Sequence, residues 1–216
     1  MNKSNQSART PPLYDYIPPA TYKPLTPFYD LGCAVLGLGK KFKKRVLGSV
    51  PVQDGQSIAD VGCGTGVFLE IAKEKYPHSR VVGLDPDKEA LVIARSRLEK
   101  KKLAAELTEG RVETLPFPDD SFDFVFSTLA FHHIPDEHKP KAIQEIHRVL
   151  RNGGKLLIAD FGESRSWSLR LLLGFERHVK GNFEGLIMAG LQANNFRDVK
   201  ILWKKWPGIQ VVFAKK

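Results

Sequence analysis

The feature that most constrains the fold of this chain is residues 58–68, where a short apolar run leads into three glycines at alternate positions. The glycines are Gly62, Gly64 and Gly66, and apolar residues recur at helical spacing after them. Strand, glycine-rich turn and helix in this order are typical of the first βαβ unit of a nucleotide-binding domain. Glycine lets the backbone approach a ligand closely, and the helix start adds unpaired N–H groups beside it. The sequence therefore predicts a ligand site after the first strand.

The spacing of the glycines also indicates which ligand is bound. A dinucleotide fingerprint that starts at Gly62 would need a glycine at position 67, where Val67 stands. Asp60 precedes the first glycine by two residues, and its carboxylate would repel a pyrophosphate but suit an amino-bearing ligand. Asp85 follows a second apolar run, where a carboxylate can accept hydrogen bonds from both ribose hydroxyls. The pattern therefore predicts a site for a nucleoside without a diphosphate.

Four motifs in a fixed order carry a family resemblance. They are Asp-Val-Gly-Cys-Gly-Thr-Gly at 60–66, Gly-Leu-Asp-Pro at 83–86, Leu-Pro-Phe-Pro-Asp-Asp-Ser-Phe-Asp at 115–123, and Leu-Arg-Asn-Gly-Gly at 150–154 before a strand that ends at Asp160. Over residues 58–161 the chain resembles the class I S-adenosylmethionine-dependent methyltransferases, of the methyltransferase domain 11 type. It is distantly similar to the methyltransferases of ubiquinone and menaquinone biosynthesis.

The resemblance implies an α/β fold with a Rossmann-like, seven-stranded, mostly parallel sheet. An antiparallel C-terminal hairpin would close the sheet, and helices would cover both faces. The 216 residues suit one such domain. We expect a flexible proline-rich arm over 1–27 and a methyltransferase domain over 28–216, made of an N-terminal helical cap (28–50), a cofactor-binding core (51–160), a lid or substrate wall (161–185) and a closing helix and hairpin (186–216).

Hydrophobic periodicity predicts the individual elements. Strands are expected at 57–61, 80–84, near 106, at 122–127 and at 155–159, helices at 29–38, 41–47, 67–75, 87–101, 136–150 and 186–193, and a hairpin at 196–203 and 209–214. Asp87 is a candidate N-cap. Gly153 and Gly154 are expected to end the helix that precedes them.

The resemblance also implies S-adenosylmethionine as the cofactor. The glycine turn would pass under its methionine portion, Asp60 would orient the amino end, and Asp85 would bind the ribose. The expected cofactor-binding residues are Asp60, Gly62, Cys63, Gly64, Gly66, Asp85, Pro86, Arg111, Val112, Ser127 and Leu129.

Arg111 departs from the family pattern. The family often has an aspartate at this position, which binds the adenine amino group, whereas a guanidinium has no acceptor. Arg111 could stack on the ring instead, with the backbone N–H of Val112 holding the base. This arrangement would weaken the selectivity for adenine.

His132 and His133 follow the fourth strand, beside the expected methyl position, and three interpretations compete. They could ligate a metal with Asp136 and His138, although the spacing is loose and we expect no metal. One of them, His133 or His132, could be a general base for the acceptor's proton. They could also only line the cleft, because methyl transfer by in-line displacement mainly needs positioning.

The net charge of +9 lies at the two ends of the chain. Residues 1–50 carry eight basic and two acidic side chains, and residues 200–216 carry five lysines and no acid. If the ends meet in space, they would form one basic face. The basic run 40–45 follows an apolar stretch, so it could lie on an anionic membrane and reach a lipophilic acceptor, or be the solvated edge of an ordinary helix.

The remaining composition predicts a cytoplasmic protein. The only cysteines are Cys33 and Cys63, which indicates no disulfide framework, and the polar N-terminus lacks the apolar region of a signal peptide. We predict an S-adenosylmethionine-dependent methyltransferase that acts on a small or lipophilic molecule. The alternatives are a nucleic-acid methyltransferase, for which no RNA-binding module is recognisable, and a non-catalytic cofactor-binding module. The sequence indicates no oligomeric state.

Overall fold

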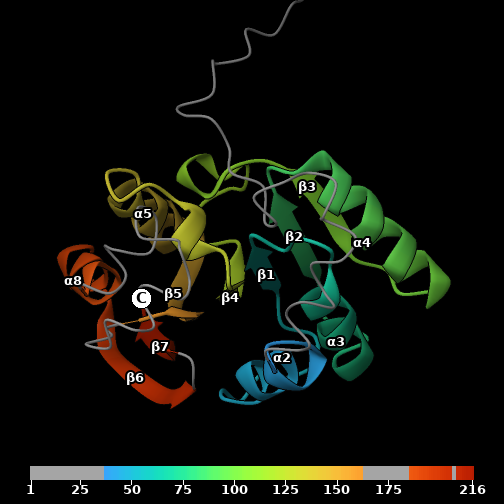
Figure 1. Ribbon diagram of the computed structural model, residues 1–216, viewed down its shortest axis with the longest axis horizontal. Coiled ribbons are helices and arrows are strands. Elements are labelled where there is room, and N and C mark those ends of the chain that lie inside the picture. The colour runs from blue at the N-terminus through green and yellow to red at the C-terminus, as the bar shows by residue number, and fades with distance from the viewer. Residues whose placement is uncertain (1–36, 163–184, 206–207) are drawn as a thin grey trace, which may run out of the picture.

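The computed structural model describes residues 37–162, 185–205 and 208–216, and these form one seven-stranded sheet (Figure 1). The strand order is β3-β2-β1-β4-β5-β7-β6. The strands are β1 (Ile58–Val61), β2 (Val81–Asp85), β3 (Glu106–Glu109), β4 (Phe122–Thr128), β5 (Leu150–Phe161), β6 (Arg197–Lys205) and β7 (Ile209–Lys215). The pairs among β1 to β5 are parallel, whereas β7 pairs antiparallel with both β5 and β6. The expected α/β fold is confirmed.

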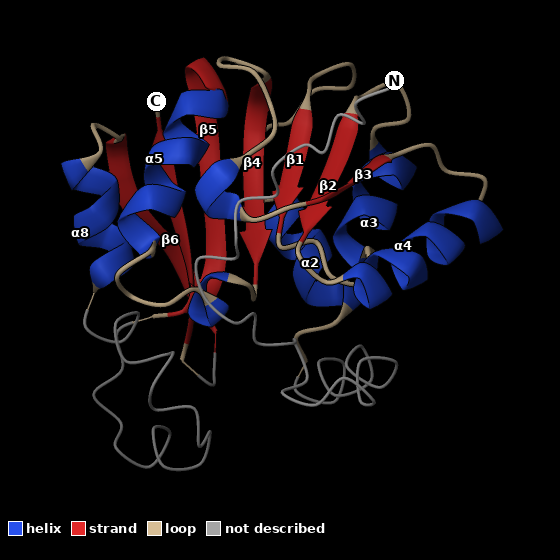
Figure 2. Ribbon diagram, turned by 90° about the horizontal axis from the view of Figure 1, so that it is seen from above, coloured by secondary structure: helices blue, strands red, loops and turns tan. Residues whose placement is uncertain are grey.

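Helices cover both faces of the sheet (Figure 2). The described α-helices are α2 (Lys40–Leu47), α3 (Val67–Lys75), α4 (Lys88–Lys100), α5 (Lys139–Val149) and α8 (Leu186–Ala193), and two short 3-10 turns are η2 (Val112–Thr114) and η3 (Phe131–His133). Apolar side chains of α2, α3 and α4 form one core layer with the sheet, and those of α5 and α8 form the other. The fully buried strands β1 and β2 lie between these layers, as central parallel strands do.

The strand order reverses at β1. The chain passes from β1 outward to β2 and β3, and then returns to the other side of β1 with β4. Helices on the two sides of such a switch point diverge, which leaves a crevice at the carboxyl ends of the strands. The glycine turn that follows β1 therefore faces this crevice together with the ends of β2 and β4.

Several predicted boundaries agree with the structure, but the end of the helix before β5 and the start of β5 do not. Helices 67–75 and 186–193 have the predicted bounds, and the Asp87 carboxylate caps α4 by accepting from the N–H groups of Glu89 and Ala90. However, α5 begins at Lys139 and ends at Val149, so the prediction that Gly153 and Gly154 end this helix was wrong. Leu150 already pairs with Phe122 of β4, and the two glycines lie inside β5.

The glycine pair has a different role in the strand. Gly153 has a φ of +79°, and a Cβ on Gly154 would come within 2.8 Å of the Arg151 carbonyl oxygen. The backbone therefore bends tightly here, and the pairing of β4 with β5 shifts its register between Phe122 and Phe124. Glycine is required for this bend in a strand, a use that the helix-ending pattern did not distinguish.

The basic helix α2 is fixed to its neighbours. Its apolar residues Phe42, Val46 and Leu47 are buried, and Lys40 Nζ lies 2.6 Å from Glu70 Oε1 of α3. The Arg45 guanidinium lies 4.1 Å from the centre of the Trp203 ring of β6. The basic helix from the first end of the chain thus contacts the C-terminal strand β6 through Arg45, and both Lys40 and Arg45 face protein partners.

Three expected segments fall wholly or largely outside the described residues. They are the arm at 1–27, the helix at 29–38 and the lid or substrate wall at 161–185. Their assignments stay predictions.

Candidate functional site

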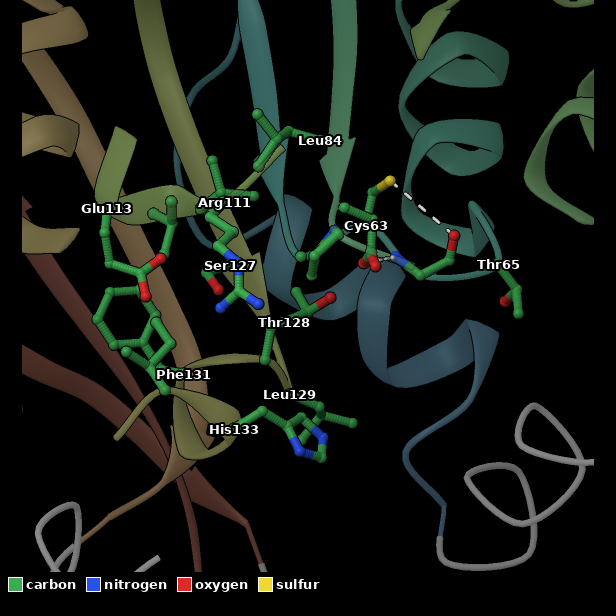
Figure 3. Close-up of a pocket in the computed structure, with 18 of the residues that line it drawn as sticks. Cys63, Thr65, Leu84, Arg111, Glu113, Ser127, Thr128, Leu129, Phe131 and His133 are labelled. Carbon is green, nitrogen blue, oxygen red and sulfur yellow. Dashed lines mark hydrogen bonds between the residues drawn. The ribbon is translucent and has the colours of Figure 1, made fainter. Parts of the chain in front are cut away.

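A pocket lies at the carboxyl ends of the central strands, at the switch point of the sheet. It is lined by the turns after β1 and β2, the end of β4, the turns η2 and η3, and one residue of α2 (Figure 3). The predicted site residues that line it are Gly62, Cys63, Gly64, Asp85, Pro86, Arg111, Val112, Ser127, Leu129 and His133. The predicted residues Asp60, Gly66 and His132 do not belong to its wall.

The first two glycines shape the floor of this pocket. A Cβ on Gly62 would lie 2.3 Å from the Ala130 Cβ, so a side chain there would collide with the turn after β4. Gly64, with a φ of +51°, has no atom within 4 Å of its missing Cβ, and it lies beside open space. The backbone is therefore bare where a ligand would lie against it.

Gly66 has a packing role instead. It is the N-cap of α3 with a φ of +78°, and a Cβ there would lie 2.8 Å from the Ala94 Cβ of α4. The third glycine thus lets α3 and α4 approach each other at the start of the helix. The glycine pattern identified the turn but could not separate this glycine from the two that face the pocket.

Asp85 holds the turn in place from the end of β2. Its Oδ2 accepts from the Gly64 N–H at 2.7 Å, and its Oδ1 accepts from the Asp87 N–H at 2.9 Å. Burial raises the pKa of Asp85 to about 6, although both hydrogen bonds and the charge of Lys43 oppose the rise. A carboxylate has about four lone-pair sites. Two backbone bonds therefore leave room for the two ribose hydroxyls that the sequence predicted.

Asp60 lies behind the pocket wall. Its side chain is fully buried, and neither carboxylate oxygen has a hydrogen-bond partner among the residues that the structure describes. Burial raises its pKa to about 7, the Lys43 charge lowers it, and the neighbouring Asp85 raises it. A buried carboxylate without a partner favours a cation nearby. Asp60 can therefore attract the amino end of a ligand through its charge from behind the pocket wall.

Arg111 points into the pocket on the side of Ser127 and Thr128 (Figure 3). It precedes η2, whose first residue, Val112, also lines the pocket. The hydroxyls of Ser127 and Thr128 are buried and have no hydrogen-bond partner within the described ranges. This part of the pocket therefore offers hydroxyls and guanidinium N–H groups to a ligand, and no carboxylate at position 111.

The two histidines have different surroundings. His132 Nδ1 lies 2.8 Å from Asp160 Oδ1, and the same carboxylate accepts from the backbone N–H groups of His132 at 3.2 Å and Phe161 at 2.7 Å. His133 lines the pocket, and its ring centre is 4.0 Å from that of His132. Only His133 is therefore placed to touch a ligand, with His132 held against it by Asp160.

Lys43 is a pocket residue that the sequence analysis missed. It is half-buried and is the only residue of α2 in the pocket wall. The available signal was the helical spacing, which puts Lys43 one turn before the buried Val46 and Leu47. The basic run at 40–45 looks uniform in sequence, so Lys43 does not stand out from its neighbours.

No group of three or more His, Cys, Asp or Glu side chains is arranged to hold a metal ion within residues 37–162, 185–205 and 208–216. In the same ranges, no helix has the length and apolar character needed to cross a bilayer.

Residues 58–154 match the family model described as "Methyltransferase domain". A relative from Listeria welshimeri, named "Demethylmenaquinone methyltransferase", is 33% identical over 143 residues, which are 64% of this chain and 60% of the relative. This chain thus spans about 60% of the length of that curated relative.

Solved structures show the same fold. An S-adenosylmethionine-dependent methyltransferase from Aquifex aeolicus has a TM-score of 0.65 at 22% identity, over 80% of this chain and 88% of that one. A phosphoethanolamine N-methyltransferase 2 from Haemonchus contortus, in complex with S-adenosyl-L-methionine, has a TM-score of 0.66 at 27% identity, over 76% of this chain and 38% of that one. In its matched domain and its fold, this chain is similar to the class I S-adenosylmethionine-dependent methyltransferases.

Proposed function

We propose that this protein transfers a methyl group from S-adenosylmethionine to a small or lipophilic acceptor by in-line displacement. The observation that carries the proposal is the pocket at the switch point of the sheet, where a bare glycine turn and Asp85 line the wall and Asp60 lies buried behind it. When bound, the cofactor supplies a methyl group on a sulfonium centre. Two carboxylates near the turn suit its cationic groups.

The residues present fit this cofactor. The unpartnered Asp60 carboxylate favours a cationic ligand, and the open space beside Gly64 leaves room for it against the turn. We assign the methionine portion to Gly62–Gly64, the ribose hydroxyls to the remaining lone pairs of Asp85, and the base to Val112 and Arg111. Ser127 and Leu129 line the cleft between these parts and the acceptor side.

The chain's own contribution to the reaction is mainly positioning. The pocket wall on the acceptor side is apolar, which excludes water from the reacting groups: Leu129, Ala130, Phe131 and Ile134 all line it. His133 is the group placed to accept a proton from the acceptor. Asp160 acts through His132, whose ring it orients and against which the His133 ring packs.

We infer that the acceptor is a lipophilic, quinone-type molecule. The relatives' name gives demethylmenaquinone as the molecule that they methylate, and the apolar wall suits a ring of this kind. We also propose a cytoplasmic location with peripheral contact to anionic membrane, through the exposed Lys41 and Lys44 of α2. Flotation with liposomes that contain or lack anionic lipid tests the contact, and binding that is independent of anionic lipid would rule it out.

The function is tested in two stages. Calorimetric titration of the full chain with S-adenosylmethionine and S-adenosylhomocysteine should give micromolar binding. Transfer of labelled methyl from the cofactor to demethylmenaquinone-type quinones, with RNA as the competing acceptor, should then label the quinone alone. Absence of binding would overturn the proposal, labelled RNA would indicate the nucleic-acid alternative, and binding without transfer to any acceptor would indicate a non-catalytic module.

A further inference from the structure

Lys43 occupies an unusual position among the cations of α2. Lys40 is bound to Glu70 at 2.6 Å and lies 3.6 Å from Glu74, and Arg45 stacks on Trp203. Lys43 instead lines the pocket, half-buried. Among the residues that the structure describes, its ammonium group has no hydrogen bond or salt bridge, so its charge remains available to a ligand.

The Lys43 charge acts at the glycine-turn end of the pocket. Its field lowers the pKa of both Asp60 and Asp85, against the effect of their burial. The three charged groups therefore lie near one another around the turn, with Lys43 and Asp85 both in the pocket wall. Lys43 comes from α2, which lies outside the matched family domain at 58–154.

This arrangement matches the charges at the amino-acid end of the cofactor. That end carries an α-ammonium group, which the two aspartates attract, and an α-carboxylate, which the same aspartates repel. A carboxylate in a partly buried pocket needs a cation or N–H donors to offset its lost hydration. Lys43 supplies a cation at the end of the pocket where this carboxylate must lie.

We propose that Lys43 is a specificity-determining residue, which pairs with the α-carboxylate of the cofactor and so selects an intact amino-acid end. The inference rests on the proposed function, because it assumes a cofactor with a zwitterionic end. It assigns to α2 a contact that the glycine and aspartate motifs do not supply. Asp60 then attracts the ammonium group and Lys43 the carboxylate of the same zwitterion.

The test compares two ligands that differ by this carboxylate. They are S-adenosylhomocysteine and its decarboxylated analogue, S-adenosyl-3-thiopropylamine, and calorimetry measures both with the full-length wild type and with Lys43→Gln. The wild type should prefer S-adenosylhomocysteine by roughly 10-fold to 100-fold, as expected for one charge-assisted pair. Lys43→Gln should lose most of this preference, and Lys43→Arg should keep it.

The ratio of the two affinities is the decisive quantity. Removal of Lys43 also raises the pKa of Asp60, which weakens the binding of the ammonium group, but this effect is common to both ligands. Lys44→Gln, an exposed lysine on the same helix, is the matched control and should behave as the wild type. Thermal unfolding of each variant checks that the fold is kept.

The outcomes separate the inference from the function on which it rests. If the wild type binds neither ligand, the proposed function fails. If it binds S-adenosylhomocysteine and Lys43→Gln keeps the same preference over the decarboxylated analogue, the role of Lys43 is overturned while the function stands. A preference that falls in Lys43→Gln and persists in Lys44→Gln and Lys43→Arg supports the inference.

Discussion

Two regions of the molecule each carry a buried aspartate that differs in its hydrogen bonding. The first region is the carboxyl ends of β1 and β2, and the second is the carboxyl ends of β4 and β5. At the first, Asp60 is buried without a hydrogen-bond partner in the described structure, and its pKa rises to about 7. At the second, Asp160 is equally buried but receives three hydrogen bonds, from His132 and from the Phe161 N–H. We expect a charged ligand to complete the surroundings of Asp60, whereas Asp160 already has its hydrogen bonds and fixes the His132 side chain. Cofactor binding and acceptor chemistry should therefore respond separately to substitution.

The largest effect is expected for Asp85→Ala. This change removes the acceptor for the Gly64 and Asp87 N–H groups and for the ribose, so the affinity for S-adenosylhomocysteine should fall about 100-fold or more. Calorimetry measures the loss. Asp87→Ala is the control, because it removes the N-cap of α4 at a cost of about 1 kcal/mol of stability but keeps the pocket. An Asp85→Ala protein that binds almost as tightly as the wild type would contradict the assignment.

The second region is tested by His133→Ala. If His133 accepts the acceptor's proton, turnover should fall on the order of 100-fold while the cofactor affinity stays constant. Asp160→Asn should give a smaller loss and shift the pH profile, since Asp160 acts only through His132. Steady-state rates over a pH series measure both. Unchanged turnover of His133→Ala at all pH values would leave only the lining role.

Asp60→Asn tests the first region through the pH dependence of the free energy of unfolding. Asp60 has a pKa of about 7 in the folded state, against an ordinary value of 3.8. Between these two pH values, Asp60 is protonated in the folded state and ionised in the unfolded state. Its contribution to the free energy of unfolding is thus favourable at low pH and is lost as the pH rises toward 7. From pH 6 to pH 8 the ligand-free wild type should lose about 1 to 2 kcal/mol relative to Asp60→Asn.

Urea unfolding at the two pH values gives this difference. Asp160→Asn, at the other region, is the comparison variant. The cofactor affinity of Asp60→Asn should also fall, because the charge that attracts the ammonium group is gone. A wild type and an Asp60→Asn protein with parallel pH dependence would show that Asp60 titrates as an exposed carboxyl does.

The smallest effect is expected for Arg111→Asp. An aspartate restores the acceptor that the adenine amino group lacks, so the preference for S-adenosylhomocysteine over its 6-oxo analogue, S-inosylhomocysteine, should rise by roughly 3-fold to 10-fold. Calorimetry with both ligands measures the ratio. An unchanged ratio and affinity would count against a binding role for this position.

The sequence predicted the first region better than the second. The turn at 62–66 and helix α3 follow from glycine spacing and a strong 3.6-residue period, which are local properties. The pairing of His132 with Asp160 is a contact between residues 28 positions apart, and no local pattern indicates it. His132 and His133 look equivalent in sequence, yet only His133 lines the pocket.

Lys43 and Gly66 show the same limit within the first region. The glycine spacing could not show that Gly66 faces Ala94 of α4, because that contact depends on how two helices pack. Likewise, the basic run at 40–45 is uniform in sequence, and only the docking of α2 separates Lys40, Lys43 and Arg45 into three environments. Tertiary packing decided these roles.

The ion-pair cluster around Glu70 has a consequence for the dynamics of α2. Glu70 is 3% exposed and pairs with Lys40 of α2, with Arg97 of α4 and with Lys101, the residue after α4. Burial alone would raise the pKa of Glu70, but these pairs lower it to about 2. The carboxylate stays charged down to that pH, so the attachment of α2 persists in mild acid. A ligand held by α2 must bind less well when the helix is detached, and by linkage its binding must slow amide hydrogen exchange in that helix.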